Sequence, residues 1–190
     1  MTAVPDKTFG ERFDRALAWS SSLHRAQRRK GTDVPYVSHL LAVAAIAIEH
    51  GASEDEAIAA LREKFGDAVL AIVEGCTDAD TIPKPPWKER KEAYLRRLAT
   101  APPSVLLVSC ADKLHNVRST VADLSVAVDR EAYWKRFNGG KDGTLWYYRS
   151  LGKLFLQRLP GRLSEDLARA VLEMTALASG PVAGQGCGLG

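Results

Sequence analysis

The sequence predicts an all-α fold, a single-domain helical bundle, and three features support this class. Apolar residues recur every three or four positions through most of the 190 residues, which is the spacing of one helix face. Few segments alternate apolar and polar residues, so the pattern contains no convincing β-strand. The length fits one domain, because domains typically hold about 100 to 200 residues.

The first half of the chain predicts four helices. The first runs over 9–27, and Pro35 separates it from a second helix that starts near Val37. Ser53 is expected to cap a third helix whose first turn is acidic, and Asp67 opens a fourth. The second helix is expected to bury one face, formed by Leu41, Ala44, Ala45 and Ile48.

The second half predicts five more helices, separated by residues that break helices. Ser104 is expected to cap the longest of them. The breaks fall at Pro102-Pro103, Gly139-Gly140 and Pro160-Gly161. The five helices are expected over 88–98, 104–124, 131–137, 144–159 and 164–177. The chain as a whole then divides into an N-terminal tail (1–8), a helical domain (9–179) and a flexible glycine-rich tail (180–190).

The composition excludes several classes of protein. A chain that is 46% hydrophobic and 26% charged is globular rather than disordered. The net charge of +3 is too small to predict nucleic-acid binding, and no apolar run is long enough to span a membrane. The N-terminus lacks the apolar core of a secretory signal. The three cysteines are odd in number and far apart, which fits a reducing cytoplasm. We therefore expect a cytoplasmic protein, and the pattern predicts no particular oligomeric state.

A polar face interrupts the long apolar helix expected over 104–124. Asp112 and Asn116 are four residues apart, and His115 and Ser119 lie beside them, so this face carries a carboxylate, an amide, an imidazole and a hydroxyl. Polar groups in so apolar a helix need partners. A satisfied core network and a functional cleft would both supply them, and the residue types alone favour neither.

A second cluster lies before and within the second helix. Arg28, Arg29 and Lys30 would suit phosphate, because cationic side chains make charge-assisted hydrogen bonds to it. His39 is a potential metal ligand, and Asp112 could share the same ion. The alternatives are a solvated loop for the basic residues and a structural role for the histidine.

A third cluster covers 84–97, where six basic residues accompany two acidic ones. Such a surplus would attract a polyanionic molecule to a nearby cleft, although an ordinary exposed helix face has the same composition. Trp87 and the aromatic run 146–148 would stack on a base or belong to the core.

Taken together, these stretches resemble the HD-domain phosphohydrolases, and most closely the small alarmone hydrolases. The resemblance is carried, in the order of the family, by residues 24–30, 35–39, 111–116 and 137–148. It implies an all-α domain that uses a manganese ion. The implied reaction removes pyrophosphate from the 3′ position of guanosine tetraphosphate or pentaphosphate.

The resemblance also implies roles for single residues. His39 and Asp112 correspond to metal ligands, whereas His115 supports the fold. The family has adjacent His and Asp ligands and then a Glu-Asp pair, but here Leu61 runs straight into Arg62 without them. The catalytic residues are therefore unknown. The residues implied to contact the nucleotide are Arg29, Lys30, Asn116 and Ser119.

A missing ligand block has a physical consequence. A catalytic metal normally has at least three protein ligands, and Glu56 and Glu63 are the replacement candidates near the junction. We therefore expect weak or absent manganese binding, retained affinity for guanosine polyphosphates and impaired hydrolysis. Three hypotheses stay open: a metal-dependent hydrolase, a degenerate domain that binds a nucleotide or a partner, and a purely structural helical module.

Overall fold

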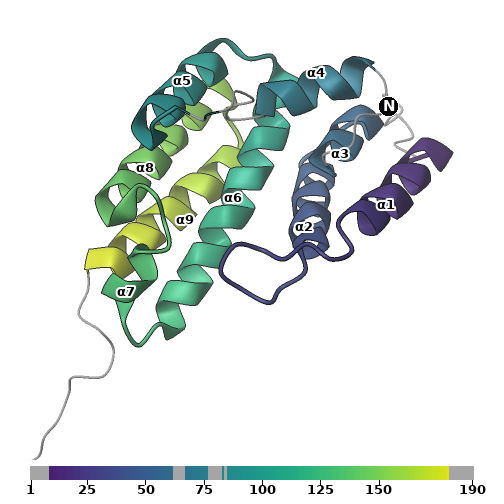
Figure 1. The fold of residues 1–190 in the computed structure, drawn as a ribbon. Helices are drawn as coiled ribbons and strands as arrows, with labels where there is room; N and C mark the ends of the chain where they lie inside the picture. The colour runs from purple at the N-terminus through teal and green to yellow at the C-terminus, as the bar shows by residue number, and fades with distance from the viewer. Residues whose placement is uncertain (1–8, 62–66, 77–82, 84, 180–190) are drawn as a thin grey trace, which may run out of the picture. The chain divides into compact units, whose positions relative to one another are not determined.

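All regular secondary structure in the described part of the chain is helical, which confirms the all-α class. The computed structural model describes residues 9–61, 67–76, 83 and 85–179. Apart from helices, these residues form one isolated bridge, between Arg28 and Pro35. The helices in Figure 1 are α1 (Glu11–Leu23), α2 (Tyr36–Glu49), α3 (Glu54–Ala60), α4 (Asp67–Cys76), α5 (Trp87–Thr100), α6 (Pro103–Val126), α7 (Arg130–Trp134), α8 (Gly140–Arg158) and α9 (Arg162–Ser179).

The helices group into two compact units. The first takes in 1–77 and 102–112, and the second takes in 78–101 and 113–190. Helix α6 therefore begins in the first unit and ends in the second. No described helix is both long enough and apolar enough to cross a membrane. The two expected tails lie outside the described residues, and so does Phe65 of the third predicted helix.

The first unit is built around α3, which packs against α1, α2 and α4 (Figure 1). The expected cap of α3 is confirmed as a capping box, in which Ser53 and Glu56 satisfy each other's backbone amides. Arg12 of α1 binds Asp55 in the first turn of α3. The core of the unit is apolar, and its fully buried residues include Ala16, Leu40, Ala47, Ile58 and Leu61.

The predicted buried face of α2 is shifted by one residue: Ala44 is buried as expected and Ile48 is half-buried, but Leu41 and Ala45 are exposed. Leu41 is 45% exposed, whereas Leu40 and Val43 are buried. One residue corresponds to a rotation of about 100° around the helix axis, since a turn holds about 3.6 residues. His39 lies on this rotated face next to Leu40, and its imidazole contacts Asp112.

The second unit is built around α8, which packs against α5, α7 and α9 (Figure 1). Arg130 joins the ends of two helices, because its guanidinium donates to the carbonyl oxygens of Leu124 and Leu177 at 3.3 and 3.1 Å. The core of this unit includes Tyr94, Leu98, Leu151, Phe155, Leu167 and Met174.

Several predicted helix ends shift in the structure. Ser104 does not cap α6, because the helix already begins at Pro103, and proline suits the first helical position. Helix α7 is capped by Asp129, a cap that the sequence pattern did not predict. The carboxylate of Asp129 accepts a hydrogen bond from the amide of Ala132 at 2.9 Å. The break at Pro160-Gly161 is confirmed, and Gly161 has a φ of 145° that favours glycine.

Helix α8 begins at Gly140, four residues earlier than predicted, and its start packs closely against the ring of Trp87. A Cβ atom on Gly139 would lie 2.6 Å from this ring, and one on Gly143 would lie 3.1 Å from it. The predicted break at Gly139-Gly140 is therefore a place of close packing between α5 and the start of α8.

We expect Gly139→Ala to lower the free energy of unfolding by about 1 to 3 kcal/mol, because the new methyl group overpacks against Trp87. Urea unfolding measures the change. Gly152→Ala in the same helix is the control, since nothing lies within 4 Å of its Cβ position. This control should stabilise the protein by up to about 1 kcal/mol through helix propensity. Equal effects of the two substitutions would contradict the packing role of Gly139.

Candidate functional site

A buried contact between His39 and Asp112 is the centre of the candidate site. The imidazole Nε2 of His39 lies 3.0 Å from Oδ1 of Asp112. The two residues are only 4% and 7% exposed, and both belong to the first unit. The expectation that these side chains approach each other is confirmed. Two polar groups taken out of water in this way depend on each other for hydrogen bonding.

The two residues directly before Asp112 on α6 are buried and apolar. Ala111 is fully buried, and so is Cys110, where burial raises the pKa of the thiol to about 12. The thiolate is the nucleophilic form of cysteine, so Cys110 is not a candidate nucleophile at neutral pH.

The basic residues before α2 lie on a hairpin that closes at the start of this helix. The amide of Arg29 donates to the carbonyl of Val34 at 2.9 Å, and the amide of Tyr36 donates to the carbonyl of Gln27 at 2.9 Å. Gly31, with a φ of 74°, makes the turn. Arg28 and Lys30 are exposed, and Arg29 is half-buried.

Two aromatic contacts connect this hairpin with the buried pair. The ring of Tyr36 lies 5.6 Å from the ring of His39 and 5.2 Å from the ring of His24. His24 also contacts the side chain of Gln27, its Nδ1 lying 2.7 Å from Oε1. In the sequence Tyr36 stands beside the basic residues of the second cluster, but its contact with His39 was not predicted. The available signal was the spacing of Tyr36 and His39, which lie three residues apart and therefore on one helix face.

Asn116 and Ser119 lie on the part of α6 that belongs to the second unit. Both are half-buried, and the hydroxyl of Ser119 donates to the carbonyl of His115 at 2.9 Å. Their positions, four and seven residues after Asp112, place them on the same helix face as this carboxylate. Contact with a nucleotide stays a prediction for both.

The buried pair fits a divalent metal in donor type and spacing but not in donor number. Two adjacent ligands at right angles, each about 2.1 Å from an ion, lie about 3 Å apart. Among the described residues, however, no three His, Cys, Asp or Glu side chains gather into a ligand set. The carboxylate of Glu56 already accepts from the amide and hydroxyl of Ser53, at 2.6 and 2.9 Å, and Glu63 lies outside the described residues. The described donors therefore do not complete a catalytic metal shell.

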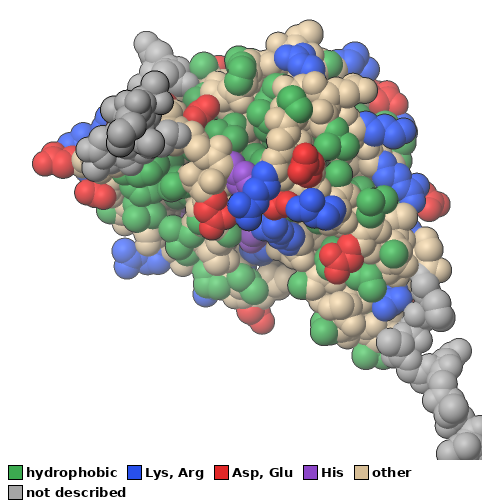
Figure 2. All heavy atoms as spheres, turned by 180° about the vertical axis from the view of Figure 1, so that it is seen from behind, with side chains coloured by type: hydrophobic (Ala, Val, Ile, Leu, Met, Phe, Trp, Pro, Cys, Tyr) green, Lys and Arg blue, Asp and Glu red, His purple; other side chains and the backbone are tan. Residues whose placement is uncertain are grey.

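The third basic cluster is partly engaged in contacts of the second unit. Nζ of Lys88 lies 3.3 Å from the ring centroid of Trp146, and Nζ of Lys91 lies 4.8 Å from that of Tyr147. Trp87 packs edge-on against both aromatic rings, each at 6.3 Å. These contacts favour the core interpretation of the aromatic residues. Lys84 lies outside the described residues. On the face that Figure 2 shows, Lys and Arg side chains are interspersed with acidic ones.

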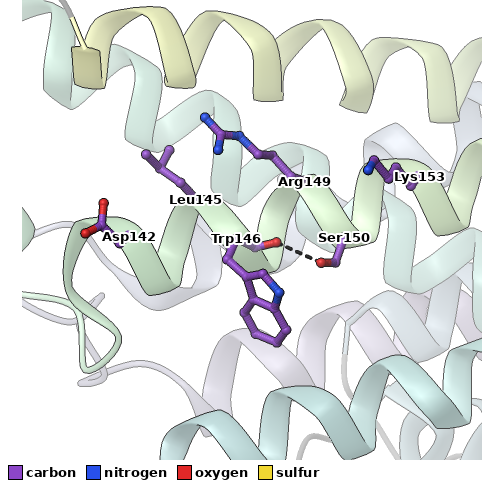
Figure 3. A pocket seen from close by; sticks show the side chains of 6 residues that line it. All are labelled: Asp142, Leu145, Trp146, Arg149, Ser150 and Lys153. Atoms are coloured by element: carbon purple, nitrogen blue, oxygen red, sulfur yellow. Dashed lines mark hydrogen bonds between the residues drawn. The ribbon is translucent and has the colours of Figure 1, made fainter.

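A shallow pocket of about 390 Å³ lies along α8 of the second unit. All the side chains that line it come from this one helix, and Figure 3 shows Trp146 and Arg149 pointing to different sides of it. The hydroxyl of Ser150 donates to the carbonyl of Trp146 at 2.9 Å. Because all the described residues that line the pocket belong to α8, it supports no ligand assignment.

Comparison with known proteins gives one family match. Residues 16–136, more than half of the chain and parts of both units, match the family described as "HD domain". A GTP pyrophosphokinase of Streptomyces coelicolor is 34% identical over 126 residues, covering 56% of this chain and 14% of that protein. The chain thus matches a small part of this relative's length.

Other relatives are closer in size. The guanosine-3′,5′-bis(diphosphate) 3′-pyrophosphohydrolase MESH1 of Xenopus tropicalis is 34% identical over 121 residues, covering 54% of this chain and 66% of that protein. A solved metazoan orthologue of SpoT superposes with a TM-score of 0.67 at 23% identity, covering 88% of this chain and 97% of its own. A Listeria monocytogenes structure superposes with a TM-score of 0.59 at 26% identity, covering 70% and 96%.

In these alignments, some residues of the relatives are aligned to gaps in this chain. The match to MESH1 extends over 121 residues but covers only 54% of these 190 residues, and the match to the Streptomyces coelicolor protein shows the same shortfall. The aligned region of the relatives is therefore longer than the corresponding region here.

We expect His39 and Asp112 to be energetically coupled. The substitutions His39→Ala and Asp112→Ala should each destabilise the protein, and their effects should differ from additivity by about 0.5 to 3 kcal/mol, because either one already breaks the contact. Urea unfolding of the two single variants and the double variant measures this difference.

The matched control pairs Asp112→Ala with His50→Ala, a half-buried histidine at the other end of α2. The changes in unfolding free energy caused by Asp112→Ala and His50→Ala should add to within about 0.5 kcal/mol. Additive effects for the His39 pair would show that the contact contributes no coupling energy.

Proposed function

The chain belongs to the HD-domain family, and from this premise we propose that it binds guanosine polyphosphates and hydrolyses them slowly. The observation that carries the proposal is the buried contact of His39 with Asp112, joined through Tyr36 to a hairpin of basic residues. Several relatives at about one-third identity bear names that describe removal of pyrophosphate from guanosine-3′,5′-bis(diphosphate).

The basic hairpin supports the binding half of the proposal. Arg29 and Lys30 follow each other at the turn, and the backbone hydrogen bonds of the hairpin hold them close to the start of α2. Arginine and lysine are the side chains that recognise phosphate groups by charge-assisted hydrogen bonds. In this proposal Asn116 and Ser119 contribute further polar contacts to the nucleotide.

The incomplete ligand set supports the slow-hydrolysis half. HD-domain phosphohydrolases are metal-dependent, and a metal ion makes a nucleophile by lowering the pKa of bound water. His39 and Asp112 supply two donors, and the described residues add no third. In this proposal the His-Asp and Glu-Asp block of the family is absent at the junction of Leu61 and Arg62. Manganese as the preferred ion and a cytoplasmic location are part of the same proposal.

We expect wild-type protein to bind guanosine tetraphosphate in an equilibrium assay and to release pyrophosphate only slowly with manganese present. The double substitution Arg29→Ala and Lys30→Ala should weaken binding by about tenfold or more, because a hydrogen bond to a charged group contributes about 1.5 to 3 kcal/mol. Arg15→Ala, on the exposed side of α1, removes the same kind of charge and should leave binding unchanged.

Two outcomes would contradict this function. Rapid pyrophosphate release that Asp112→Ala abolishes would make the chain an efficient hydrolase. Neither binding nor release in folded protein would leave only a helical module.

We further expect manganese to bind weakly, because two protein donors leave most of the coordination shell to water. Calorimetric titration of metal-free protein with manganese chloride measures the affinity, and His39→Ala serves as the reference. Tight one-to-one binding that His39→Ala abolishes would mean that other residues of the chain complete the shell.

A further inference from the structure

We propose that Tyr36 is a positioning residue that orients His39 and couples it to the basic hairpin. Tyr36 is the first residue of α2 and takes part in both structures. Its amide closes the hairpin on the carbonyl of Gln27, and its ring packs on the ring of His39. The role of Tyr36 in ligand binding rests on the proposed function, whereas its effect on the His39 ring does not.

The ring contacts restrict the orientation of His39 from one side. The planes of Tyr36 and His39 meet at 45° with 5.6 Å between centroids, within the range of favourable aromatic contacts. The Asp112 carboxylate holds the Nε2 edge of the same imidazole. An imidazole held by a hydrogen bond on one edge and a ring on its flank has little freedom to rotate, because each contact excludes the rotamers that break the other.

The outer side of Tyr36 is fixed by His24. The rings of Tyr36 and His24 meet at 60° with 5.2 Å between centroids. The side chain of Gln27 contacts His24, and the backbone carbonyl of Gln27 accepts a hydrogen bond from the amide of Tyr36. The half-buried ring of Tyr36 is thus packed between a histidine that precedes the hairpin and the histidine that contacts Asp112.

Backbone contacts also connect Tyr36 with the basic residues of the hairpin. Arg28 is bridged to Pro35, and the amide of Arg29 donates to Val34, so a shift of the hairpin moves the residue directly before Tyr36. A phosphate group bound by Arg29 and Lys30 would restrain the hairpin. Because the ring of Tyr36 rests on His39, that restraint should reach the buried imidazole.

The test follows the His39 imidazole by NMR, in long-range proton–nitrogen spectra of labelled protein, with the signals assigned by their loss in His39→Ala. The chain has four histidines, so the spectra are simple. Tyr36→Leu removes the ring and should shift the His39 nitrogen signals in ligand-free protein by more than the lost ring current alone accounts for. It should also weaken guanosine tetraphosphate binding by about tenfold, the lower end of what loss of an orienting neighbour typically costs.

Tyr36→Phe keeps the ring and should restore both the His39 signals and the affinity to wild-type values, a rescue that loss of stability alone would not explain. Trp19→Leu removes an exposed aromatic residue of the same unit and should change neither. If Tyr36→Leu does not fold, Tyr36→Met replaces it, since methionine is flexible and fills irregular space without a ring.

Unchanged His39 signals in a folded variant without the ring would overturn the positioning role. A Tyr36→Phe variant as impaired as Tyr36→Leu would overturn it too, because the hydroxyl and not the ring would then be responsible. If wild-type protein does not bind the nucleotide, the proposed function fails. The comparison of ligand-free variants then still decides whether Tyr36 orients His39.

Discussion

The contact between His39 and Asp112 constrains the first unit, because it joins α2 to α6 through two buried polar groups. Both groups are buried among apolar residues, where an unmatched polar group costs several times what a typical surface contact contributes. This contact requires that α2 turn the face with His39 towards α6. The rotation in turn decides that Leu40 and Val43 face the core and that Leu41 faces water. A polar pair therefore sets the packing of the apolar residues around it.

Much of the fold was predictable because local signals mark helix ends. The capping box at Ser53 and the break at Pro160-Gly161 depend on residues adjacent in the chain, and both occur where expected. The phase of α2 and the start of α8 were not predictable in this way. These elements contact Asp112 and Trp87, which come from distant parts of the sequence. Hydrophobic spacing alone cannot show which of two adjacent faces a distant partner selects.

The candidate site also contains residues that the sequence predicted and contacts that only the fold reveals. His39 and Asp112 were identified from their chemistry and from the resemblance to a family, and the structure brings them together. The contacts of Tyr36 with His39 and His24 were not predicted, because these three rings meet only in the fold. The hairpin needed the structure as well, since its backbone pairing spans a segment without strand periodicity.

The boundary between the two units falls inside α6, between Asp112 and Lys113, and this limits how the chain can be divided. Each helical amide bonds the carbonyl four residues earlier, so a cut there would sever a continuous ladder and leave two frayed ends. Neither unit is thus a module that recombination could transplant intact.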